Sequence, residues 1–338
     1  MAGLFDDARL EDEQWLARID APLRHLAELG ARLRREADAA AAQHLTADDR
    51  PRAVVAAGSE ARLIRALLEP TCPVPFVAWP SHGLPGWVGP LDLVIVLATD
   101  GSDPGLVATV REAVRRGARL LVACPPGSLI AEHAAARGTT MLPMHTGDTL
   151  AAVLLVLSCL HDLGLGPRVD IAEVADAVDQ VAIACSPSAD LAANRAKELA
   201  CALADAQPLV WGGSVLAARA SRRIAEALRA ESGRPALAAD ARELLPIINA
   251  TTGRDLFADP FDDPAGDRRP VLVVCADGPD DEIDRAARTS LMAAADRRDV
   301  RVAVIDHDAP SAVARYAAVL QEGRFAALYL GLGLADEQ

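Results

Sequence analysis

The feature that most constrains this chain is a series of short apolar runs, each followed by a segment with helical spacing. The clearest run, Leu93–Leu97, contains no polar residue, which is typical of a central parallel strand covered on both faces. The segment after it, Pro104–Arg116, has apolar residues on one stripe and stops before Gly117, a residue suited to a helix C-cap. This alternation predicts an α/β protein with mostly parallel sheets flanked by helices.

The two halves of the sequence contain similar patterns in the same order. In the first half, VVAAGSEARL ends a strand-like run at Gly58 and Ser59, and VIVLATDGSD follows. In the second half, LVWGGSVLAARA places Gly212, Gly213 and Ser214 after a strand-like run, and VLVVCADGPD follows. We interpret the two halves as tandem α/β units, because self-similarity of this kind indicates a duplicated structural unit.

The composition of the segments divides the chain further. A helix expected over residues 149–163 is apolar nearly all round, as is typical of a core helix or a subunit contact. At the end of the chain we expect one helix from near Pro310 and another over residues 325–330. The predicted organisation is an N-terminal helical segment over 1–45, a first α/β domain over 46–165, a helical linker over 166–206 and a second α/β domain over 207–338.

The charge balance excludes several classes of partner. The net charge is -14, with 48 acidic and 34 basic residues, so nucleic acid is not an expected ligand. The longest apolar run, residues 150–160, is far shorter than the roughly 20 residues of a membrane-spanning helix. The first residues, MAGLFDDARLEDEQ, are acidic where a secretory signal is basic and then apolar. We therefore expect a cytoplasmic protein with no membrane partner.

The Gly-Ser loops are candidate anion-binding sites. A loop that joins a strand to a helix presents backbone N–H groups at the positive end of the helix dipole, where a phosphate is stabilised. Gly58-Ser59 and Gly212-Gly213-Ser214 fit this pattern. The alternative is that the glycines only allow a tight turn. No Walker lysine follows either loop, which excludes a P-loop nucleotide-binding site.

Cofactor and metal sites are not indicated by the sequence. Lys197 is the only lysine, so lysine-based chemistry has one candidate. The six cysteines form no CxxC pair or zinc spacing. Asp100, Asp103, Asp277 and Asp280 follow strand-like runs, where they either hold a divalent cation or cap helices. We favour capping and predict no cofactor and no metal.

These motifs resemble the sugar isomerase (SIS) fold, and most closely the bifunctional phosphoglucose/phosphomannose isomerase family. The resemblance covers about residues 50–332 and rests on AAGSEA, VLATDGSDPG, NRAKELACAL, LVWGGSVLAARASRRIAEALRAESGRPA and GRFAALYLGLGLAD. It implies two tandem SIS domains, a sugar-phosphate ligand and a homodimer. In that family hydroxyls and backbone N–H groups hold the phosphate. A glutamate transfers the proton between C1 and C2, a histidine helps open the sugar ring, and a late lysine assists.

The phosphate loop departs from the family pattern. The positions that carry hydroxyls in the family align with Ala98, Asp100, Ser102 and Asp103, and of these only Ser102 has a hydroxyl. A carboxylate about 4 Å from one phosphate charge is repelled by roughly 4 kcal/mol at an effective dielectric constant of 20. The predicted ligand-binding residues are Gly58, Ser59, Gly101, Ser102, Gly212, Gly213 and Ser214.

The catalytic positions depart as well. The family's glutamate, five residues before a Pro-Ala pair, aligns with Ala230, and Glu231 follows one residue later. On a helix that step turns a side chain by about 100°. Glu243 aligns with another family glutamate, whereas Pro246 takes the place of the family's histidine. The candidate catalytic residues are therefore Glu231 and Glu243, each with the alternative of an exposed or ion-paired carboxylate.

One further histidine is an acid–base candidate. His307 follows a strand-like run between Asp306 and Asp308, and the alternative is an ordinary polar loop. Three hypotheses follow from the whole sequence. The chain binds a sugar phosphate with catalysis weakened or lost; or it is an active aldose–ketose isomerase with Glu231 as base; or it is a structural partner that oligomerises through its 149–163 helix.

Overall fold

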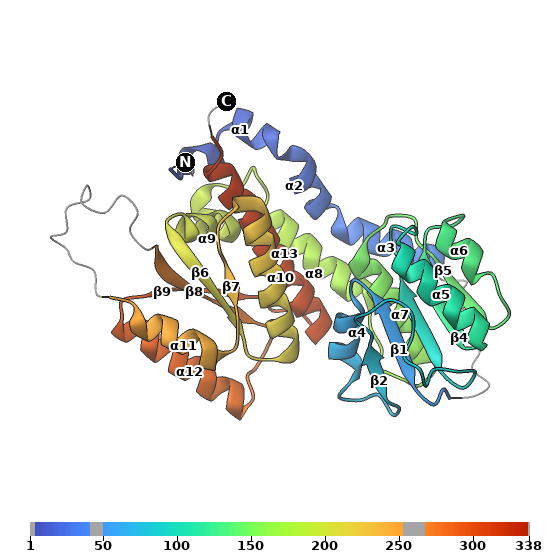
Figure 1. Cartoon of the computed structure of the whole chain (residues 1–338). Coiled ribbons are helices and arrows are strands. Elements are labelled where there is room, and N and C mark those ends of the chain that lie inside the picture. The colour runs from blue at the N-terminus through green and yellow to red at the C-terminus, as the bar shows by residue number, and fades with distance from the viewer. Residues whose placement is uncertain (1–3, 41–49, 253–267, 337–338) are drawn as a thin grey trace. The chain divides into compact units, whose positions relative to one another are not determined.

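The computed structural model describes residues 4–40, 50–252 and 268–336, and Figure 1 shows the order of the elements. The chain divides into two compact units. We call Gly30–Ala175 the five-stranded unit, and Met1–Leu29 together with Asp176–Gln338 the four-stranded unit. Every strand pair in both sheets is parallel. The predicted α/β class with two parallel sheets flanked by helices is confirmed.

The five-stranded unit has the strand order β2-β1-β3-β4-β5. Its elements are α3 (Leu29–Ala40), β1 (Val54–Gly58), α4 (Ala61–Leu68), β2 (Phe76–Ala78), β3 (Leu93–Leu97), α5 (Pro104–Arg116), β4 (Arg119–Cys124), α6 (Leu129–Ala134), β5 (Thr139–Pro143), α7 (Thr149–Asp162) and the first residues of α8 (Ile171–Ala184).

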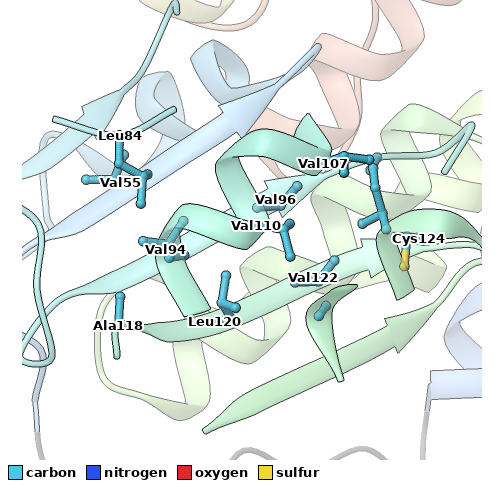
Figure 2. Packing of buried hydrophobic residues seen from close by; sticks show 14 of the residues in the cluster. Val55, Leu84, Val94, Val96, Val107, Val110, Ala118, Leu120, Val122 and Cys124 are labelled. Carbon is cyan, nitrogen blue, oxygen red and sulfur yellow. The ribbon is translucent and has the colours of Figure 1, made fainter. Parts of the chain in front are cut away.

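The core of this unit explains why its sequence runs are so apolar. All five residues of β3 are buried, because helices cover the sheet on both faces. On one of these faces, Val94 and Val96 of β3 pack with Val110 of α5 (Figure 2). The apolar helix expected over 149–163 is α7, which is buried along most of its length. Gly117 ends α5 with a positive φ of 69°, as its C-cap assignment predicts.

The four-stranded unit has the strand order β7-β6-β8-β9. Its elements are η1 (Asp7–Leu10), α1 (Glu13–Arg18), α2 (Asp20–Ala27), the rest of α8, η2 (Leu191–Ala193), α9 (Arg195–Leu203), β6 (Ala206–Gly212), α10 (Val215–Ser232), β7 (Leu237–Ala238), α11 (Ala241–Ala250), β8 (Arg269–Ala276), α12 (Glu282–Arg297), β9 (Arg301–Asp306) and α13 (Ala312–Gly333).

The C-terminal helix differs from the sequence prediction. The two helices expected from near Pro310 and over 325–330 are one continuous helix, α13. Gly323 does not interrupt it, because α10 packs so closely there that an added Cβ would lie 2.4 Å from a side-chain carbon of Ile224. The N-terminal segment also packs on α13, since the Gln321 amide donates to the Leu26 carbonyl at 2.7 Å. Close packing therefore offsets the low helix propensity of glycine.

The boundaries of the compact units fall inside helices. One lies between Leu29 and Gly30 at the start of α3, and the other between Ala175 and Asp176 in α8. The functional division into α/β domains over 46–165 and 207–338 stays a prediction. Among the described residues, no helix has both the length and the apolar character that crossing a membrane requires.

Candidate functional site

The loops after β1 and β3 lie together at the carboxyl edge of the five-stranded sheet. The two strands pair in parallel, with Gly58 opposite Leu97. Gly58 has a φ of 115°, and an added Cβ would lie 2.2 Å from the Leu97 carbonyl oxygen. Only glycine fits this close approach, and it leaves Ser59 exposed at the edge of the sheet.

The loop between β3 and α5 also depends on a glycine. Gly101 is buried with a φ of 69°, and an added Cβ would lie 2.5 Å from Cβ of Ser128. Its carbonyl accepts a hydrogen bond from the Ile130 amide at 3.2 Å, which ties the loop to α6. Ser102 follows and is exposed. The structure thus brings four predicted ligand-binding residues, Gly58, Ser59, Gly101 and Ser102, to the same sheet edge.

Two aspartates accept hydrogen bonds from backbone amides at the β3–α5 loop. The Asp100 carboxylate accepts from the Ser102 amide at 3.2 Å. Asp103 is the N-cap of α5 and accepts from the Leu106 amide at 2.8 Å. The capping role favoured from the sequence is confirmed for Asp103. The donors that would stabilise a phosphate at this helix N-terminus are therefore partly satisfied within the chain.

The corresponding loop of the four-stranded unit is closed by a side-chain contact. Ser214 is the N-cap of α10, and its hydroxyl oxygen accepts from the Ala217 amide at 3.0 Å. The same hydroxyl donates to Asp277 Oδ2 at 2.6 Å. Since β6 and β8 are neighbours, Asp277 reaches Ser214 from the end of the adjacent strand. The hydroxyl that the sequence assigned to a ligand is occupied by this carboxylate.

Negative charge gathers around the Ser214 loop. Gly213 lies against Asp284, whose Cβ would be 2.9 Å from an added Cβ. Burial raises the pKa of Asp284, and the neighbouring carboxylates Asp281, Asp280 and Asp277 raise it further. This concentration of carboxylates disfavours the binding of a phosphate dianion. In the described residues, no three or more His, Cys, Asp or Glu side chains are arranged to hold a metal ion.

The predicted catalytic glutamates lie apart from these loops. Glu231 is exposed in the last turn of α10, and Ser214 lies at the other end of the same helix, about 26 Å away at 1.5 Å per residue. Glu243 is exposed on α11 and accepts a hydrogen bond from the Asp240 amide at 3.2 Å. With Asp240 it forms a capping box, which is a structural role. One small ligand therefore does not touch both Glu231 and Ser214.

Two other titratable residues have partners that sequence reasoning missed. His307 Nε2 lies 2.8 Å from Oε2 of Glu322, a buried carboxylate on α13. Lys197 is 1% exposed and donates to the carbonyl oxygens of Pro187 and Ala189 at 2.9 and 2.8 Å. Burial lowers the pKa of Lys197. The signal in the sequence for the His307 contact was a charged residue, Glu322, within a mostly apolar helical segment.

Comparison with known families supports the resemblance found from the motifs. Residues 192–334 match the model of the bacterial phospho-glucose isomerase C-terminal SIS domain. The four-stranded unit is therefore similar to this SIS domain, and the predicted resemblance to the phosphosugar isomerase family is confirmed. No curated protein matches the sequence.

Solved structures of phosphosugar enzymes are similar over nearly the whole chain. The C-terminal domain of glucosamine-fructose-6-phosphate aminotransferase from Francisella tularensis has a TM-score of 0.64 at 12% identity, covering 92% of this chain and 95% of that one. Tagatose-6-phosphate ketose/aldose isomerase from Escherichia coli has a TM-score of 0.61 at 15% identity, with coverages of 96% and 90%. A putative phosphosugar isomerase from Silicibacter pomeroyi has a TM-score of 0.57 at 14% identity, with coverages of 96% and 96%. At these identities the likeness establishes the fold.

Proposed function

We propose that this SIS-domain chain binds a sugar phosphate at the carboxyl edge of the five-stranded sheet, with catalysis weakened or lost. The observation that carries the proposal is the β1–β3 edge, where Gly58 allows the close approach to Leu97 and both Ser59 and Ser102 are exposed. Hydroxyls and helix N-termini at such an edge are suited to a phosphate. The structurally similar proteins include phosphosugar isomerases, which agrees with this ligand class.

The same loop predicts that phosphate binding is weak. Asp100 and Asp103 take the amides of Ser102 and Leu106, so a phosphate meets fewer free donors. A carboxylate about 4 Å from one phosphate charge costs roughly 4 kcal/mol at an effective dielectric constant of 20, and less when solvated. The helix N-terminus contributes only about 0.3–2 kcal/mol in return. We therefore expect millimolar rather than micromolar affinity for glucose 6-phosphate.

The catalytic part of the proposal rests on the glutamates. An aldose–ketose isomerase needs a base within hydrogen-bond reach of the C2 proton. Glu243 is held by its capping box, and Pro246 takes the position of the histidine that the family resemblance requires. Glu231 remains the base of the alternative hypothesis, an active isomerase that works through an enediol.

The decisive experiment is proton NMR of glucose 6-phosphate and mannose 6-phosphate with the protein in heavy water. We expect sugar signals broadened by the protein, with no deuterium entering at C2 and no ketose. Deuterium at C2 above the protein-free rate would contradict the loss of catalysis. In that case Glu231→Gln decides whether Glu231 is the base, because abolished exchange with an intact fold would support it.

A pair of serine variants locates the binding site. We expect Ser102→Ala to weaken glucose 6-phosphate binding severalfold, because it removes an exposed hydroxyl donor from the β3–α5 loop. The matched control is Ser290→Ala, an exposed serine on α12 whose hydroxyl donates to the Ala286 carbonyl of the same helix. Equal affinities for the two variants would rule out the β3–α5 loop as the phosphate site.

A further inference from the structure

A small cavity of about 210 Å³ lies in the four-stranded unit beside the edge strand β9. Residues of α9, β9 and α13 line it, and four of them are charged: Arg195, Glu198, Arg301 and Glu322. None of these residues belongs to the Gly-Ser loops. The volume is below the roughly 300–1,000 Å³ of sites for drug-sized ligands, so any ligand is small.

Glu322 is the unusual residue in the lining of this cavity, because it is a buried carboxylate. It is 2% exposed in the middle of α13. Its Oε2 lies 2.8 Å from His307 Nε2 and 3.7 Å from Arg195 Nε. Neither contact counts as a hydrogen bond, so among the described residues this oxygen has only these two ion-pair contacts. A buried carboxylate normally has hydrogen-bond donors, and the cavity is where a ligand can bring one.

Arg195 does not neutralise Glu322 by itself. Its guanidinium donates to Asp306 Oδ1 at 2.8 Å and to the Val304 carbonyl at 3.3 Å. The guanidinium charge is therefore shared with Asp306, which is the nearer carboxylate. Glu198 also lines the cavity, so the three carboxylates of Glu198, Asp306 and Glu322 stand against the guanidinium of Arg195 and the imidazole of His307. This balance favours a cation.

The other end of the cavity has the opposite charge. Arg301 is exposed at the first position of β9 and forms no ion pair with the described residues. Arg301 and Ile305 both line the cavity, and they are about 13 Å apart along the strand at roughly 3.3 Å per residue.

We propose that this cavity binds a small ω-amino acid, with its ammonium group at Glu322 and Glu198 and its carboxylate at Arg301. An ammonium group supplies the donors that Glu322 lacks, and the planar guanidinium of Arg301 matches a carboxylate. Both ends of the ligand are then paired with opposite charge. A sugar phosphate dianion would be repelled by the carboxylates of Glu322 and Glu198, so this cavity disfavours binding of a sugar phosphate.

The test compares three probes that differ only in their ends: 4-aminobutyrate, butylamine and butyrate. By titration calorimetry we expect 4-aminobutyrate to bind at millimolar concentration and about tenfold more tightly than either single-ended probe. Glu322→Gln should weaken 4-aminobutyrate and butylamine about tenfold. Arg301→Gln should weaken 4-aminobutyrate similarly and leave butylamine within about twofold, because it removes only the carboxylate partner.

Matched controls make the test independent of folding. Arg297→Gln removes an exposed arginine from the end of α12, and Glu226→Gln removes an exposed glutamate from α10; both should leave all three affinities unchanged. Arg301 is exposed, so its variant tests the site even if Glu322→Gln fails to fold. The proposal is overturned if 4-aminobutyrate does not bind, if butyrate binds as tightly, or if Arg301→Gln behaves like Arg297→Gln.

Discussion

The Gly-Ser loops of the two units share a sequence pattern but differ in what their aspartates contact. In the five-stranded unit Asp103 caps its own helix and leaves Ser102 exposed. In the four-stranded unit Asp281 caps α12, and Asp277 accepts from the Ser214 hydroxyl on the neighbouring strand's loop. The counterpart of Asp277 in the five-stranded unit, Asp100, accepts from the Ser102 amide of its own loop. The partner of this one aspartate therefore separates an open loop from a closed one. Similar loop sequences in two repeats therefore do not ensure that both sheet edges can bind a ligand.

The largest expected effect tests what the two loops share, which is the need for glycine. Gly58→Ala places a Cβ 2.2 Å from the Leu97 carbonyl oxygen, and Gly212→Ala places one 2.2 Å from the carbonyl carbon of Ala217. Each should lower the free energy of unfolding by about 3 kcal/mol, because backbone atoms cannot move aside cheaply.

Urea denaturation measures this effect, with Gly233→Ala as the control. Gly233 has a φ of 66° but open space around an added Cβ, so its variant should lose only about 1 kcal/mol. A loss for Gly58→Ala no larger than that of Gly233→Ala would mean that the β1–β3 edge is looser than its geometry indicates.

The second prediction sharpens the contrast between closed and open loops. Ser214→Ala removes the N-cap of α10 and the hydrogen bond to Asp277, so it should cost about 2 kcal/mol. Ser102→Ala removes an exposed hydroxyl and should change stability by less than about 0.5 kcal/mol. Thermal unfolding of both variants measures the difference. Equal losses would show that Ser102 has a structural partner as well.

The third prediction concerns charge in the open loop. Asp103→Asn keeps a good N-cap and removes one negative charge beside the proposed phosphate. We expect glucose 6-phosphate to bind about tenfold more tightly, which corresponds to about 1.4 kcal/mol. Asp277→Asn is the matched change in the closed loop and should leave this affinity unchanged. Phosphorus NMR titrations measure both, and an equal gain for Asp277→Asn would assign the phosphate to the other unit.

The smallest expected effect is a pH dependence of folding stability, caused by Asp284 beside the closed loop. Burial, followed by the charges of Asp281, Asp280 and Asp277, raises the pKa of Asp284. A raised carboxyl pKa means that the folded state holds the proton more tightly than the unfolded state, so ionised Asp284 opposes folding above that pKa. Asp284→Asn should therefore gain a few tenths of a kcal/mol at pH 7, because solvent screens this partly exposed group.

The gain from Asp284→Asn should disappear as the pH falls below about 3.9, the ordinary pKa of aspartate, where the wild-type side chain is also protonated in both states. Thermal unfolding of the two proteins from pH 3 to 8 measures this. Asp296→Asn, an exposed change near the end of α12, is the control. A gain that is constant with pH would show that packing rather than charge is responsible.

The sequence by itself determined the strands other than the two-residue β7, the parallel topology and the glycines of the loops. Apolar runs such as Leu93–Leu97 have few alternatives to a buried parallel strand, and β3 has those bounds. The paired Gly-Ser loops also follow from local pattern, since a tight strand-to-helix turn requires glycine where the backbone approaches another strand, as Gly58 does.

Only the tertiary structure decided which side chains meet. Asp277 contacts Ser214, and Glu322 contacts His307, across elements that no local pattern connects. The continuous helix α13 was missed for the same reason, because the packing of Gly323 against α10 outweighs its weak helix propensity. Local spacing fixes elements, whereas contacts between distant residues depend on how sheets and helices pack. The contacts of Asp277 and Glu322 are therefore not visible in the sequence pattern.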